Sequence, residues 1–105
     1  MRVTVSHTKN KEEVMRAVDR SFEDLFRGIG AIPVQFDDER RNWQGSTLSF
    51  SFTAKMGFMS TPIKGIVEVT DRDLTIDADL GLFERLLPTA KVQQSVSGAV
   101  RGLLK

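Results

Sequence analysis

The run TLSFSFTAKM, residues 47–56, alternates apolar and polar side chains without a break. Successive side chains of a strand point to opposite faces of a sheet, so this run predicts a strand with one apolar face. That face carries Leu48, Phe50, Phe52, Ala54 and Met56. An apolar sheet face has to be buried against a second layer, and the flanking sequence supplies candidates for that layer.

Further strands are predicted on both sides of this run. Residues 57–61 form a loop, residues 63–69 a fourth strand, and a turn at 71–73 leads to a fifth strand at 74–80. Towards the N-terminus, residues 2–7 alternate, and residues 32–36 alternate with Pro33 at a strand start or edge. The charged residues 37–42 read as a strand end or turn, and residues 44–46 as another turn.

Two amphipathic helices complete the pattern. Asn10 caps the first, with Glu13 completing a capping box, and Gly28 and Gly30 end it. A short apolar turn over residues 82–87 precedes Pro88, and Thr89 is the predicted N-cap of the last helix. Spacings of three and four residues give each helix one apolar face: Val14, Ala17, Val18, Phe22, Leu25 and Phe26 in the first, and Val92, Val96, Ala99, Val100 and Leu103 in the second.

These elements predict an α+β fold of one domain, residues 1–105. The order is β-α-β-β-β-β-α, a two-layer sandwich with an antiparallel sheet and both helices on one face. The arrangement looks like a helix-grip (TBP-like) fold, in which a sheet wraps a C-terminal helix and can enclose an apolar cavity. Such a likeness concerns the fold and is a weak guide to activity.

Composition excludes several classes of function. Fifteen Lys and Arg against 14 Asp and Glu give a formal charge of +1, without the basic excess of nucleic-acid-binding proteins. The chain has no cysteine and one histidine, His7, which excludes disulfides, thiolate nucleophiles and His-rich metal sites. No apolar run approaches the roughly 20 residues of a transmembrane helix, and the polar start is no signal peptide. We expect a cytoplasmic protein without a transmembrane segment.

Several segments resemble the bacterial polyhydroxyalkanoic acid system protein family. They are the strand Val3-Thr4-Val5-Ser6-His7, the aromatic-bearing segment WQGSTLSF at 43–50, the strand GIVEV at 65–69, the segment LTIDADLG at 74–81, and Leu86-Leu87-Pro88 before a terminal helix. The family is named for its association with polyhydroxyalkanoate storage granules. The resemblance implies an accessory role at such granules and brings no catalytic residues with it.

The segment Met56-Gly57-Phe58-Met59 is the first candidate contact site. Phe58 and Met59 together in a hairpin loop could dock on an apolar surface, with Met56 beside them. The alternative is that they fold over the end of the core and close it. Trp43, the only tryptophan, is a further contact candidate, although a tryptophan beside a hairpin more often packs across strands.

A second hypothesis is a carrier with a pocket between the sheet and the C-terminal helix. Ligand pockets are mostly apolar, and aromatic residues fall on the inward face of the sheet. The same residues more often fill a closely packed core. The predicted pocket lining is Phe50, Phe52, Phe83, Val96 and Ala99.

No motif predicts catalysis, a cofactor or a metal. The sequence has no Gly-x-Ser-x-Gly nucleophile elbow that would pair a serine with His7. The four aspartates Asp71, Asp73, Asp77 and Asp79 lack the glycine turn and the bidentate glutamate of a calcium loop. Alternation instead spreads the aspartates over a solvated face. We expect a non-enzymatic protein that binds a granule surface, a granule protein or an acyl ligand. An uncovered sheet face or edge strand also leaves a homodimer open.

Overall fold

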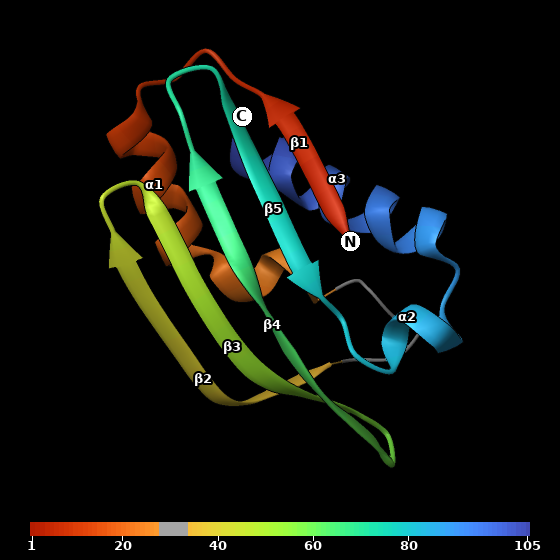
Figure 1. Ribbon diagram of the computed structural model, residues 1–105. Coiled ribbons are helices and arrows are strands. Elements are labelled where there is room, and N and C mark those ends of the chain that lie inside the picture. Colours follow the sequence, from red (N-terminus) through yellow and green to blue (C-terminus); the bar gives the residue numbers. More distant parts are fainter. Residues whose placement is uncertain (28–33) are drawn as a thin grey trace.

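The computed structural model describes residues 1–27 and 34–105 (Figure 1). Five strands form one antiparallel sheet in the order β1-β5-β4-β3-β2. The strands are β1 (Arg2–Ser6), β2 (Gln35–Gln44), β3 (Thr47–Met56), β4 (Met59–Val69) and β5 (Asp73–Asp79). The helices are α1 (Lys11–Arg20), a 3-10 turn η1 (Phe22–Leu25), α2 (Phe83–Leu86) and α3 (Thr89–Leu103).

The helices lie on one side of the sheet, as Figure 1 shows, and one hydrophobic core fills the space between the two layers. The predicted inward residues of β3 are all buried, and so are Val92, Val96 and Val100 on one face of α3. In β3 and β5, polar residues alternate with the buried ones and lie on the uncovered face of the sheet. The predicted α+β class and antiparallel sheet are therefore confirmed.

Two predicted boundaries are wrong. The charged run 37–42 is not a turn, because β2 continues along the whole length of β3 and takes up one irregularity as a β-bulge between Asp37 and Arg40. Asp38 within the bulge has a φ of 53°. The predicted loop 57–61 is a two-residue turn, since Met56 pairs with Met59. Gly57 takes the positive φ of 63° that such a tight hairpin requires at its first position.

The helices also differ from prediction in detail. The first is not continuous: α1 ends at Arg20, and the tighter η1 turns Phe22, Leu25 and Phe26 onto the sheet, where all three are buried. Thr89 is the first residue of α3 and not its N-cap; Pro88 occupies that position without a side-chain cap. The predicted helix end at Gly28 and Gly30 and the strand start at 32–33 lie outside the described residues.

The predicted cap of α1 is present. The backbone N–H of Glu13 donates to Asn10 Oδ1 at 2.9 Å. The Glu13 carboxylate accepts from the Asn10 side-chain amide at 3.0 Å, where a capping box would have it accept from the backbone. Within the described part of the chain, no helix has both the length and the apolar character needed to cross a membrane.

Candidate functional site

Exposed apolar side chains gather at one end of the molecule. Among the described residues, the large apolar side chains that are exposed are Phe58 (99%), Leu82 (47%) and Leu86 (57%). Phe58 occupies the turn between β3 and β4, at the tip of a hairpin that projects beyond the helices (Figure 1). Because Phe58 is almost completely exposed, its side chain is free to contact another molecule or a surface.

Local geometry brings the two leucines to the same end. The backbone N–H of Leu82 donates to Thr61 Oγ1 at 3.0 Å, and Gly81, at a φ of 59°, lies against Thr61 and Pro62. Thr61 pairs with Ala54 inside the β3–β4 hairpin, three residues from the turn residue Phe58. We call the set Phe58, Leu82 and Leu86 the apolar end.

The short helix α2 divides its apolar residues between two sides. Leu82 and Leu86 are four residues apart, which puts them on one face of a helical turn. Phe83 is completely buried, and Leu87 packs partly against the core. The sequence predicted an apolar turn here but did not predict that Leu82 and Leu86 are exposed. The signal was that Leu82 and Leu86, and likewise Phe83 and Leu87, are four residues apart, so the two pairs lie on neighbouring faces of the turn.

The predicted contact residues are not brought together. Phe58 does not fold over the core, whereas Met59 is half-buried against the core and Met56 is buried within it. Met56 is therefore corrected from a contact residue to a core residue. Trp43 lies at the other end of β3, next to the turn that joins β2 to β3. Its indole N–H donates to Asp19 Oδ1 at 3.1 Å, so Trp43 packs on α1.

The predicted pocket lining mostly fills the core. The ring centroids of Phe50 and Phe22 are 5.0 Å apart, and those of Phe52 and Phe26 are 5.4 Å apart. Phe83 and Val96 are fully buried, and Ala99 is half-buried at the margin. A hollow of about 270 Å³ does lie between the end of the sheet and the start of α3, but its lining is different: Met1, Leu80, Glu84, Leu87, Thr89 and Val92.

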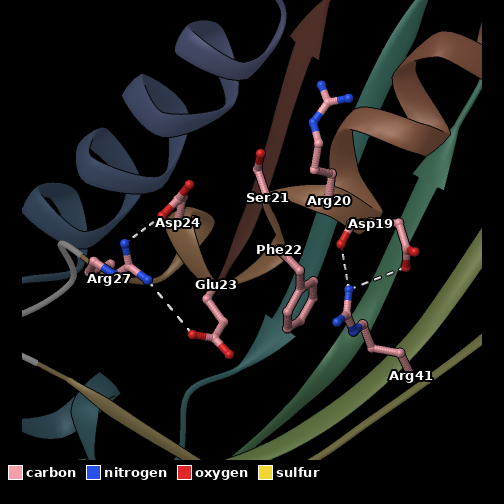
Figure 2. A pocket seen from close by; sticks show the side chains of 8 residues that line it. All are labelled: Asp19, Arg20, Ser21, Phe22, Glu23, Asp24, Arg27 and Arg41. Carbon is pink, nitrogen blue, oxygen red and sulfur yellow. Dashed lines mark hydrogen bonds and ion pairs between the residues drawn. The ribbon is translucent and has the colours of Figure 1, made fainter.

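A second hollowed region lies between α1 and β2. Figure 2 shows its polar part, about 360 Å³, where the Arg41 guanidinium reaches from β2 to the end of α1. Arg41 Nη1 donates to the Asp19 backbone carbonyl at 2.6 Å and to Asp19 Oδ1 at 3.2 Å. The guanidinium also lies 5.1 Å from the centre of the Phe22 ring. These contacts fasten β2 to α1.

The apolar part of this region adjoins the polar part. Met15, Arg16, Asp19, Arg20 and Trp43 line a shallow, open hollow of about 440 Å³, and Asp19 and Arg20 line both parts. We call the two parts together the α1–β2 groove. The sequence analysis did not predict this groove. The available signal was that Arg41 and Trp43 are two residues apart in a strand and therefore lie on the same face of the sheet.

Several ionisable groups outside the groove have structural partners. His7 Nδ1 accepts from the Lys9 backbone N–H at 3.2 Å, and Nε2 lies 2.9 Å from the Thr70 carbonyl. On the uncovered face, Lys55 Nζ is 2.7 Å from Asp37 Oδ2. This hydrogen bond lowers the pKa of Asp37 below its ordinary value and raises the pKa of Lys55. The described residues contain no group of three or more His, Cys, Asp or Glu side chains placed to hold a metal ion.

No family model and no curated protein matches the chain.

Proposed function

We propose that the protein is a non-catalytic, cytoplasmic accessory protein that attaches to the surface of polyhydroxyalkanoate granules through the apolar end. The observation that carries the proposal is the 99% exposure of Phe58 at the hairpin tip, with Leu82 and Leu86 exposed at the same end. We choose the granule surface as the binding target because several segments resemble the granule-associated family. Granule proteins and free acyl ligands are the competing occupants.

The shape of the apolar end favours a surface over a small ligand. Ligand pockets are concave and bury most of the ligand. Phe58 projects from a two-residue turn, and the hollow that Leu82 lines beside it, with Thr61 and Pro62, is shallow and open. A projecting aromatic side chain suits insertion into a soft apolar phase, which can close around it.

The expected strength of the contact is moderate. Complete burial of a Phe side chain contributes roughly 2–3 kcal/mol, and each half-exposed leucine contributes about half of a full leucine value, or roughly 1 kcal/mol. Each 1.4 kcal/mol is about a tenfold change in the binding constant. Phe58 alone therefore accounts for a factor of about 30 or more in granule affinity. Attachment through one copy is reversible.

Co-sedimentation with purified granules tests the proposal. We expect Phe58→Ser to weaken binding by at least tenfold, and we expect wild-type binding to persist in high salt because apolar contact is not screened. A matched control adds Asp71→Phe to Phe58→Ser. This puts an exposed Phe on the β4–β5 turn, at the opposite end of the sheet.

The control distinguishes a dedicated binding surface from nonspecific adhesion of exposed apolar side chains. Binding restored by Asp71→Phe would show that any exposed Phe adheres to granules, which contradicts a dedicated apolar end. Undiminished binding of Phe58→Ser would contradict it as well. Binding to granules stripped of protein, but not to a granule protein alone, distinguishes the polymer surface from a protein partner.

A carrier function is the alternative, and the hollow beside Leu80 and Val92 is the observation in its favour. Its volume of about 270 Å³ is slightly below the roughly 300–1,000 Å³ of typical ligand pockets. Retention of an apolar molecule in native mass spectra of the purified protein would support it. Spectra that show only the bare chain would count against it. The likeness to a helix-grip fold supports this alternative, because such a fold can enclose an apolar cavity.

A homodimer through the uncovered sheet face is a weaker proposal. That face is polar and carries the ion pairs Arg2–Asp77 and Lys55–Asp37, which are satisfied within one chain. Light scattering that gives the mass of one chain at working concentration would overturn it.

A further inference from the structure

The strand β2 forms one edge of the sheet. It pairs with β3 on one side, and no described strand pairs with its other side. An edge strand presents a row of unpaired backbone N–H and C=O groups on its open side. From Arg40 to Gln44 the pairing of β2 with β3 is regular, so this stretch of the edge is a straight template for one more short strand.

The α1–β2 groove lies beside this edge. Trp43 and Met15, both half-buried, line the apolar hollow of about 440 Å³, and the side chains of Arg16 and Arg20 complete it. An extended segment laid along β2 would direct every second side chain to the helix side of the sheet, where the hollow lies. Apolar side chains at those positions would be buried against Trp43 and Met15.

Charge selects the remaining side chains of such a segment. Arg16, Arg20 and Arg40 are exposed, and none of them forms an ion pair with another described residue. Figure 2 shows the Arg20 side chain directed away from Arg41, which is itself occupied by Asp19. Arg40 pairs opposite Ser51 and so points to the uncovered face, where the alternate side chains of an added strand would meet it.

We propose that the Arg40–Gln44 edge and the α1–β2 groove bind an extended peptide segment of a partner protein, in which apolar and acidic residues alternate. The apolar side chains enter the hollow beside Trp43 on the helix side, and the acidic ones lie on the uncovered face of the sheet, where the unpaired Arg40 meets them. Backbone hydrogen bonds to β2 supply affinity, while the hollow and Arg40 supply specificity, as in other cases of strand addition.

The same edge discriminates against a second copy of the chain. The bulge between Asp37 and Arg40 interrupts the edge, and bulges and charges are devices that prevent edge strands from pairing with one another. Asp38 at the bulge is exposed, forms no ion pair with another described residue and repels the acidic segment there. The bound segment is consequently limited to about the five residues opposite Arg40–Gln44.

Trp43 makes the test direct, because it is the only tryptophan in the chain. The full chain is titrated with the capped peptide Glu-Val-Glu-Val-Glu-Val-Glu while Trp43 fluorescence is recorded. We expect a saturable change in emission. A peptide with lysine in place of glutamate should bind at least tenfold more weakly, and so should one that is N-methylated at every residue, which cannot pair with a strand edge.

Variants of the protein complete the test. Arg40→Glu should weaken binding of the glutamate peptide at least tenfold, because Arg40 shares the uncovered face with the glutamates. Arg72→Glu makes the same kind of charge change at an exposed site on the β4–β5 turn and should leave binding unchanged. No saturable change, equal binding of the lysine peptide or equal binding of the N-methylated peptide would each overturn the proposal. Phe58→Ser should not affect this titration, so its result is independent of granule binding.

Discussion

Gly65 shows at the scale of one residue how the sheet fits beneath the helices. It lies in the middle of β4, between Phe50 of β3 and Ala78 of β5. A Cβ atom at this position would collide with the backbone oxygen of Asp77 and would come within 2.7 Å of the Cα atom of Ala78. The neighbours are backbone atoms, which cannot rotate away, so only glycine allows this approach of the two strands.

Gly65→Ala should therefore lower the free energy of unfolding by about 1–3 kcal/mol, the usual cost of overpacking. Gly98→Ala in α3 is the matched control, since its added methyl group meets nothing within 4 Å. Replacing a helix glycine by alanine stabilises by up to about 1 kcal/mol. Urea unfolding measures both, and equal effects of the two substitutions would contradict this view of Gly65.

The limits of the sequence are also clearest at single residues. The alternation of residues 47–56 identified which side chains point to the core, because that depends only on strand geometry. Whether Phe58 closes the core or projects from it depends on the length of the turn, and that length is set by the pairing of Met56 with Met59. The exposure of Phe58 could not be predicted from the turn residues alone.

At the scale of elements, most predictions from local signals are confirmed, the N-cap at Thr89 being the exception, whereas features that depend on distant residues were missed. The cap at Asn10 and the apolar faces of α1 and α3 follow from residues within one or two turns of each other, and the structure has them. The charged run 37–42 belongs to β2 because β3 supplies a partner along the whole strand, with a bulge between Asp37 and Arg40. The break after Arg20 allows Phe22 and Phe26 to reach the rings of Phe50 and Phe52. Both depend on partners far away in the sequence.

The caps of the two long helices provide a prediction at this scale. Asn10→Ala removes the acceptor for the Glu13 N–H and should cost about 1 kcal/mol of stability. Thr89→Ala is the matched control, because Thr89 lies inside α3 and caps nothing. Thermal or urea unfolding of both variants tests the assignment. A larger loss from Thr89→Ala than from Asn10→Ala would show that the caps are wrongly placed.

At the scale of the whole molecule, the two candidate surfaces are well separated. The apolar end includes the β3–β4 turn, whereas Trp43 lies beside the β2–β3 turn, so the ten residues of β3 run from one surface to the other. At about 3.3 Å per residue, this is a separation of roughly 30 Å. Together, the two proposed surfaces would let the chain hold a partner protein at a granule surface.

The sequence could predict only part of this arrangement. It identified Phe58, Met59 and Trp43 as candidates because each is an aromatic or apolar residue near a turn. It could not join Leu82 and Leu86 to Phe58, since they are brought together by the contact of Gly81 and Leu82 with Thr61. Nor could it bring Arg41 and Trp43 to Asp19, more than 20 residues away along the chain.

One measurement tests most directly whether the apolar end is the attachment site. The chain has no cysteine, so Ser60→Cys near the hairpin tip and Asp71→Cys on the β4–β5 turn can each carry a single polarity-sensitive fluorophore. On addition of polyhydroxyalkanoate granules, we predict a blue shift in the emission of the probe at position 60 and no shift at position 71. Equal shifts at both positions, or a shift at position 71 alone, would contradict attachment through Phe58, Leu82 and Leu86.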